Sequence, residues 1–375
     1  MRIVRTASLL GVGLMAAASG AWAERHADVF GMELQSDPQG ISVHRVDAGT
    51  EAEARGIQAG DRIVELNGTE VSESWDFMSR IDGLGPRLRL RTLRGEEPRR
   101  VTLRRPELAG KLVFRSDRAG PWELWRMNVD GSDLRQVTTH GLDPQGAVWS
   151  PDGKRIAFEC QTPYWDIWVM DEDGGHLRQL TSFPDAETRP RWSADGKYVY
   201  FISYQWGGTA IGRIDLASGK QEKIAQISDT PALAPFRFPV YDVSPDGRRL
   251  AFPVATPQGW RLHYAKADGS DVRSAGFEGE QTAIDWAPDG SRLLWSAGSA
   301  YRWLDYETKG IADFRLGERG WAMFAPDSAS VIFDAPPRDA EKRDLYVADL
   351  TGKTLHRLTY HPANDHWADW WAPRD

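Results

Sequence analysis

A short turn-forming motif recurs six times in this 375-residue sequence, and this repeat limits the possible folds more than any other feature. Successive copies lie 38 to 51 residues apart, measured between their third residues. A repeat of this length is typical of propellers and solenoids. The six copies are Trp149-Ser150-Pro151-Asp152-Gly153, Trp192-Ser193-Ala194-Asp195-Gly196, Val243-Ser244-Pro245-Asp246-Gly247, Trp286-Ala287-Pro288-Asp289-Gly290, Phe324-Ala325-Pro326-Asp327-Ser328 and Trp371-Ala372-Pro373-Arg374-Asp375.

The residues within and after each motif indicate antiparallel blades. Proline fixes φ in a turn, aspartate accepts hydrogen bonds from nearby backbone N–H groups, and glycine adopts positive φ, so each copy predicts a hairpin. An apolar strand follows each turn, and a third strand and a more polar fourth strand come next. Four strands in each repeat favour propeller blades over a solenoid.

The two ends of the repeat region complete each other. Residues 111–116 (KLVFRS) read as a second strand with no first strand before it, and HWADWWAPRD at the C-terminus reads as a first strand with no second strand after it. We therefore expect a six-bladed ring over residues 111–375 that the C-terminal strand closes, which removes exposed sheet edges. Fifteen of the 17 tryptophans lie in this part of the chain, and the aromatic residues before the turns are expected to pack between blades.

Residues 26–105 predict a small α+β domain, joined to the ring by a short linker at residues 106–110. The run from Ala52 to Ile63, AEARGIQAGDRI, combines a short helix, a glycine and a turn, and the strand after it ends at Asn67-Gly68. A helix over residues 72–81 and two strands with alternating arginine and leucine follow. In this order of elements the segment resembles a bacterial PDZ domain. The expected fold class is thus mainly β, a PDZ domain followed by a six-bladed propeller.

The PDZ resemblance implies a groove in which a partner's C-terminal segment adds as an extra strand beside the helix. A loop that binds a carboxylate needs backbone N–H groups that converge, with a glycine between apolar residues, and residues 29–34 (VFGMEL) fit this requirement. The alternative is that the same residues only form core, since a PDZ domain can also serve as a packing unit. The expected peptide-binding residues are Phe30, Gly31, Met32, Leu34, Phe77, Met78 and Ile81.

The run WSPDGKRIAF followed by IWVMDEDGG resembles the repeats of TolB-type propellers, which are also described as WD40-like. In a propeller, the first strand of each blade lines the central tunnel, so its early residues should surround one mouth. A mixed polar ring of this kind suits a ligand or the extended chain of a partner, and it equally suits a tunnel filled with water. The residues expected at this mouth are Gln145, Thr188, Arg189, Gln281, Arg319 and His366.

The first 23 residues have the pattern of a secretory signal peptide, with Arg2 and Arg5, a short apolar run and the small-x-small site Ala21-Trp22-Ala23. We therefore expect a soluble exported protein, most simply a periplasmic one, without a membrane span. Cys160 is the single cysteine, so no intramolecular disulfide can form, and its place in an apolar strand predicts a small core residue. The net charge of −8 disfavours binding to nucleic acid.

Catalytic and metal-binding motifs are missing from the sequence. It contains no GxSxG, P-loop, HExxH or CxxC pattern, and Asp171–Gly175 lacks the twelfth-position glutamate of a calcium loop, so neither a metal nor another cofactor is expected. The interpretation is a non-enzymatic interaction protein that binds protein C-termini or extended peptides at its PDZ domain and an envelope protein at its propeller. The alternatives are a substrate-presenting subunit of an envelope protease, and a propeller hydrolase or lyase that acts on a peptide or glycan.

Overall fold

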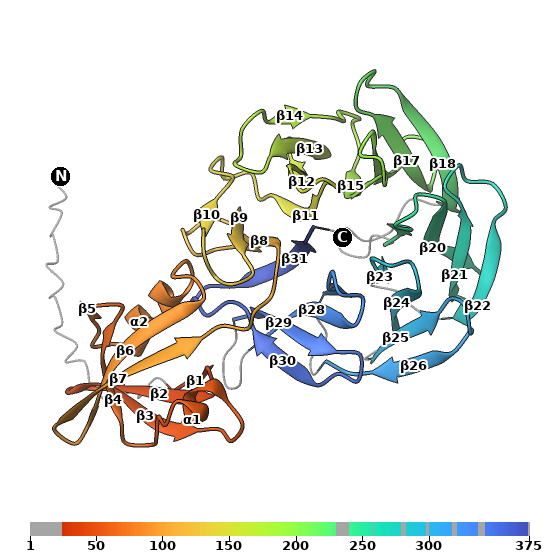
Figure 1. Ribbon diagram of the computed structural model, residues 1–375. Helices are drawn as coiled ribbons and strands as arrows, with labels where there is room; N and C mark the ends of the chain where they lie inside the picture. Colours follow the sequence, from red (N-terminus) through yellow and green to blue (C-terminus); the bar gives the residue numbers. More distant parts are fainter. Residues whose placement is uncertain are drawn as a thin grey trace, which may run out of the picture.

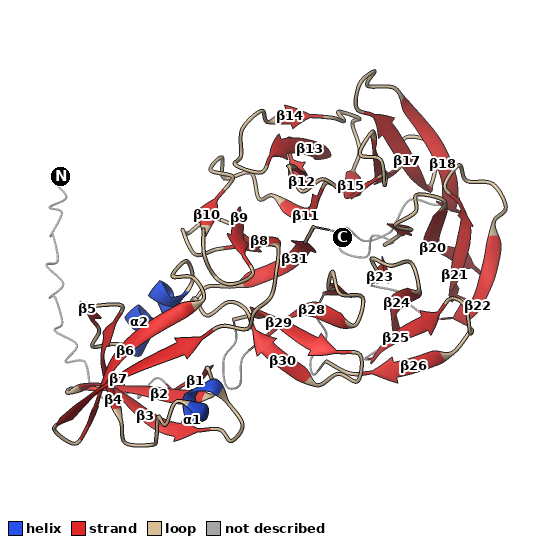
Figure 2. Cartoon of the chain, viewed as in Figure 1, coloured by secondary structure: helices blue, strands red, loops and turns tan. Residues whose placement is uncertain are grey.

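The computed structural model describes residues 25–229, 240–257, 259–278, 283–297, 300–316, 321–336 and 342–373. These residues form a small N-terminal domain that lies against the side of a ring of six sheets (Figure 1). Within the described residues, helices occur only in the N-terminal domain (Figure 2). The expected signal peptide at residues 1–23 lies outside the described part of the chain.

The N-terminal domain is one antiparallel sheet in the order β1-β2-β3-β4-β6-β7, with β5 paired to β4. Its apolar side chains form a single core that includes Ile41, Ile63, Phe77 and Leu103. The elements are β1 (Arg25–Val29), β2 (Met32–Asp37), β3 (Gly40–Val46), α1 (Glu51–Ala54), β4 (Arg62–Leu66), β5 (Thr69–Glu70), α2 (Ser74–Ile81), β6 (Arg87–Arg94) and β7 (Glu97–Arg104).

Helix α2 begins two residues later than the sequence predicts. No side chain at its N-cap, Glu73, makes a capping hydrogen bond. Instead, the Ser74 backbone N–H donates to Ser36 Oγ at 2.7 Å, and the two serine hydroxyls are 2.9 Å apart. The start of the helix is therefore fixed by a contact with β2 rather than by a local cap.

Each of the six blades is a four-stranded antiparallel sheet in which sequence neighbours pair, as predicted. Blade 1 contains β31 (Asp365–Trp371), β8 (Lys111–Ser116), β9 (Glu123–Asn128) and β10 (Arg135–Gln136). Blade 2 contains β11 (Gln145–Trp149), β12 (Arg155–Gln161), β13 (Trp165–Asp171) and β14 (Arg178–Gln179). Blade 3 contains β15 (Glu187–Trp192), β16 (Tyr198–Ser203), β17 (Thr209–Asp215) and β18 (Gln221–Ser228).

The other three blades repeat this pattern with shorter first strands. Blade 4 contains β19 (Asp242–Val243), β20 (Arg249–Thr256), β21 (Gly259–Lys266) and β22 (Arg273–Glu278). Blade 5 contains β23 (Ile284–Trp286), β24 (Arg292–Ala297), β25 (Ala300–Asp305) and β26 (Ile311–Phe314). Blade 6 contains β27 (Ala322–Phe324), β28 (Ser330–Ala335), β29 (Asp344–Asp349) and β30 (Thr354–Arg357).

Strand β31 closes the ring by pairing with β8, which confirms the closure expected from the sequence. The register of the sixth motif copy differs by one residue from the sequence alignment. Trp370, not Trp371, pairs with Leu112 and takes the place that Trp149 has opposite Ile156. In the other five blades a tight turn connects the first strand to the second and fixes the register. No turn connects β31 to β8, so β31 accommodates one more residue.

The turns have the hydrogen bonds that the motif predicts. In the first copy, Asp152 accepts hydrogen bonds from the Ser150 hydroxyl and the Lys154 N–H, and the Arg155 N–H donates to Ser150 Oγ at 2.9 Å. Gly153 has a φ of +66°, and a Cβ at this residue would lie 2.4 Å from the ring of Trp371. The first turn therefore packs directly against the closing strand.

Candidate functional site

The groove residues expected from the sequence are brought together on β2 and α2. Met32, Leu34, Phe77 and Ile81 are fully buried, and Met78 is 4% exposed. All five belong to the core of the N-terminal domain, and Phe30 packs against this core from its edge. The structure therefore places them as one apolar cluster between β2 and α2.

Phe30 and Gly31 form the tight turn between β1 and β2. Both residues have positive φ, +56° and +83°, and Val29 and Met32 face each other across the turn. This is the arrangement of a two-residue hairpin turn that matches the strand twist. Gly31 is required here for a second reason, because a Cβ at this position would lie 2.3 Å from the Thr50 side chain.

The edge of β2 opposite β3 is paired with β1. The paired positions are Arg25 with Gln35, His26 with Leu34 and Val29 with Met32, with a bulge between His26 and Val29. Val29 is fully buried and belongs to the same core as Phe77 and Ile81. The edge at which strand addition is expected is thus covered by the chain itself.

A segment of the propeller closes the end of this cluster. The ring of Tyr360 stacks on Phe30 with centroids 5.3 Å apart and planes at 10°, and Tyr360 is 4% exposed. The backbone N–H groups of Tyr360 and His361 donate to the Asp82 carboxylate at 3.2 Å, just beyond the end of α2. A propeller residue therefore belongs to the core of the N-terminal domain.

Two buried arginines complete this contact between the domains. Arg105 donates to the backbone carbonyl groups of Leu358 (2.8 Å) and Ile81 (3.0 Å) and lies 3.4 Å from Asp82. Arg118 pairs with Asp365 at 2.8 Å and also reaches Asp82 at 3.4 Å. Sequence reasoning missed these residues, because they read as ordinary charged residues at the ends of elements.

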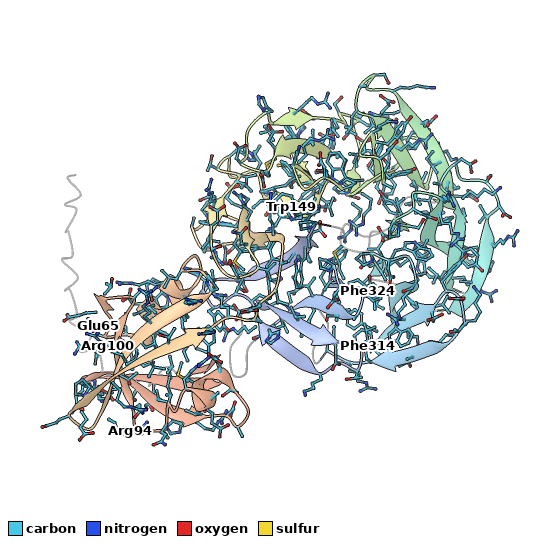
Figure 3. All side chains as sticks on the ribbon, in the orientation of Figure 1. Glu65, Arg94, Arg100, Trp149, Phe314 and Phe324 are labelled. Carbon is cyan, nitrogen blue, oxygen red and sulfur yellow. The ribbon has the colours of Figure 1, made fainter. Side chains whose placement is uncertain are left out.

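The central tunnel of the propeller contains a cavity of about 540 Å³ beside the six turns. At least two residues from the first strand of every blade line it, and in each blade one of them pairs with the third residue of the second strand. In blade order these six paired residues are Asp369, Val148, Arg191, Asp242, Asp285 and Met323. Figure 3 shows Trp149 and Phe324 on the inner side of the ring, next to this cavity.

The three aspartates link neighbouring blades. The backbone N–H of Trp149 donates to Asp369 at 2.7 Å, that of Trp286 donates to Asp242 at 2.8 Å, and that of Phe324 donates to Asp285 at 2.6 Å. Each carboxylate therefore satisfies a buried backbone donor of the next blade, which stabilises the ring.

Burial determines the protonation of these carboxylates. It raises the pKa of Asp369 to about 6, although the Trp149 N–H and the Arg191 charge act in the opposite direction. Burial also raises the pKa of Asp285 well above its ordinary value, and the nearby Asp242 charge adds to this effect. Arg191 lies 3.2 Å from Asp242. The six lining residues named above therefore include one cation and three carboxylates that have a reduced tendency to ionise.

The residues expected at the tunnel mouth lie elsewhere along the first strands. Arg189 is half-buried with φ +59°, and its guanidinium lies 5.2 Å from the ring centroid of Trp321. The two residues line a small cavity of about 10 Å³, which is about the size of one water molecule. Burial raises the pKa of Glu159, which accepts the Arg189 N–H, and the charge of Arg189 opposes this increase.

The other expected mouth residues that the structure describes do not line the larger cavity. Gln145 pairs with Glu159, Thr188 is 1% exposed, and His366 contacts Asp334 at 3.3 Å. Gln281 and Arg319 lie outside the described residues. The physical reason is a one-residue bulge in the first strands of blades 1, 2 and 3, which moves the lining positions toward the turn. The residue directly before each repeat motif is one of the six lining residues named above in five of the six blades, so a search of this position would have found most of them.

Comparison with known families agrees with this architecture. Residues 24–76 match the PDZ domain family, and residues 148–302 match the TolB β-propeller domain. The chain is a PDZ domain followed by a TolB-type β-propeller. No curated protein matches its sequence. No helix among the described residues of this PDZ–propeller protein is long and apolar enough to cross a membrane.

Solved structures resemble the PDZ–propeller chain at low sequence identity. TolB from Acinetobacter baumannii is 17% identical with a TM-score of 0.60, and the match covers 77% of this chain and 79% of TolB. A chain of a nidogen/laminin complex is 9% identical with a TM-score of 0.54, over 69% of this chain and 97% of that one. Kuenenia stuttgartiensis hydrazine synthase is 13% identical with a TM-score of 0.54, over 70% and 46%. At these identities the likeness shows the fold alone.

Proposed function

We propose that this protein is a non-enzymatic, exported interaction protein of the periplasm. Its propeller binds an extended segment of an envelope protein at the 540 Å³ cavity, and its PDZ domain is a second module that binds a strand of a partner. The cavity is the observation that carries the proposal, because all six blades contribute lining residues and the lining combines apolar and aromatic side chains with aspartates and one arginine.

The chemistry of the cavity favours binding over catalysis. Asp242, Asp285 and Asp369 each hold a backbone N–H of the next blade, so their carboxylates already have a structural role. Five aspartates line the cavity, since Asp289 and Asp327 of the turns join these three, and among the described lining residues Arg191 is the one cation, so carboxylates outnumber cations. A partner segment that carries a lysine or arginine side chain fits this excess of carboxylates.

The test is peptide binding with a variant that fills the cavity. Ala194 is exposed and lines the cavity, so Ala194→Trp should obstruct it without disturbing the core. Ala217 is exposed in a turn of the same blade between β17 and β18, so Ala217→Trp is the matched control. We expect labelled basic peptides from an extended-peptide library to bind the wild type and the control, and to lose at least tenfold in affinity with Ala194→Trp. Equal affinity for all three proteins would refute the cavity as the binding site.

A further inference from the structure

The covered edge of β2 indicates how the PDZ domain is controlled. A strand in a sheet has two edges, and β2 uses one for β3 and the other for β1. Addition of a partner strand requires unpaired N–H and C=O groups on one edge. In the structure described above, β1 already takes this position.

Strand β1 has the direction and the end point of a bound C-terminal peptide. It runs antiparallel to β2 and ends at the turn, so Val29 lies where the last residue of a ligand is expected. The Val29 side chain is fully buried in the cluster that contains Phe77, Met78 and Ile81. In place of a terminal carboxylate, the chain continues through the two-residue turn at Phe30 and Gly31.

The propeller holds this arrangement in place from outside. Tyr360 stacks on Phe30, the first residue of the turn, and its backbone is held by Asp82 at the end of α2. A ligand that ended in this pocket with a free carboxylate would have to displace the turn from beneath the Tyr360 ring. Docking of the two domains therefore favours the self-paired state.

We propose that residues 25–29 are an intramolecular ligand of the PDZ domain, and that a partner strand binds by replacing them. This inference rests on the PDZ part of the proposed function. A tethered segment acts at an effective concentration of about 1 mM, so a segment with an intrinsic Kd of about 10 µM should weaken the binding of a free peptide about a hundredfold. The groove is then closed in the isolated protein and opens only to a partner that competes with β1.

The experiment compares the wild type with a full chain that lacks residues 25–29, so that the pocket of Val29 is vacated together with the edge of β2. The probe is the fluorescently labelled hexapeptide ERHADV, the sequence of residues 24–29, with a free or an amidated C-terminus. Hydrogen exchange of the β2 amides is measured in parallel. Amides that point toward β3 alternate with those that point toward β1, so they are an internal control for the integrity of the sheet.

The expected result is tight binding of the peptide by the shortened chain and binding about a hundredfold weaker by the wild type. The β2 amides that face β1 should exchange about ten- to a hundredfold faster in the shortened chain and regain protection with the peptide. Equal binding by both proteins, or fast exchange of these amides in the wild type, overturns the proposal. If the deletion exposes the β2 amides but the shortened chain binds neither the free nor the amidated peptide, strand replacement and the PDZ part of the proposed function both fail. The proposed binding at the propeller cavity is not tested by this experiment and is unaffected.

Discussion

Asp82 provides the sharpest test of the contact between the two domains. Its buried carboxylate accepts hydrogen bonds from the N–H groups of Tyr360 and His361 and lies 3.4 Å from both Arg105 and Arg118. Asp82→Ala would leave two backbone donors without this acceptor and two buried cations without one of their partners. Removal of one member of a buried ion pair costs about 3–5 kcal/mol. We therefore expect the free energy of unfolding to fall by about 4 kcal/mol.

Asp76, on the helix α2 that Asp82 follows, is the matched control. It is partly exposed and pairs with Arg80 at 2.7 Å with a spacing of four residues, an interaction worth about 0.3–0.5 kcal/mol. Urea denaturation followed by tryptophan fluorescence measures the difference between Asp82→Ala and Asp76→Ala. Limited proteolysis at residues 106–110 shows whether the domains separate before they unfold. If the two variants lie within about 1 kcal/mol of each other and resist proteolysis equally, the buried cluster does not hold the domains together.

Three further predictions concern the propeller. The pKa of Asp369 is raised from 3.8 to about 6, so the folded state binds more protons between these values and its stability falls as the pH rises from about 4 to 6. Asp369→Asn keeps an acceptor oxygen but cannot ionise, so the variant should not lose this stability. Denaturation at several pH values should show that its free energy of unfolding, relative to the wild type, is about 3 kcal/mol higher at pH 7 than at pH 4; the same pH dependence in both proteins would contradict the raised pKa. Gly153→Ala should lower Tm by several degrees more than Gly290→Ala, because both glycines have positive φ but only the first new Cβ meets Trp371; equal losses would mean that the closing strand does not pack on this turn. Burial raises the pKa of the Cys160 thiol to about 12, so a thiol reagent at pH 8 should react only on unfolding, and rapid labelling of the folded protein would disprove this burial.

The propeller was predictable from the sequence because its information is local. Each turn carries its proline, aspartate and glycine in a fixed order, and each hydrogen bond of the Ser150–Asp152 turn joins residues at most five positions apart. Closure of the ring followed from the unpaired strands at its two ends. The register of Trp370 did not follow, because no turn ties β31 to β8 and the next residue, Trp371, packs against the turn of blade 2 at Gly153.

The site was less predictable because it depends on bulges and on contacts between distant residues. The expected mouth residue Arg189 lies in the bulge of β15, two residues before Arg191, and it is Arg191 that lines the cavity. Tyr360 and Asp82 are 278 residues apart, and neither belongs to a motif. An isolated aspartate after a helix has no sequence pattern that shows it will accept hydrogen bonds from a different domain.

The first and last described strands solve the same physical problem in different ways. Both β1 and β31 pair antiparallel with a strand that would otherwise present an open edge. β31 is paired at five positions, and Trp370 and Trp371 pack into the clusters of the adjoining blades, so the ring cannot lose it without exposing several cores. β1 is paired at three positions across a bulge, and its last residue, Val29, belongs to the core cluster. The same covering of an edge is therefore permanent structure in the propeller, while in the PDZ domain it is weak enough for a partner strand to replace.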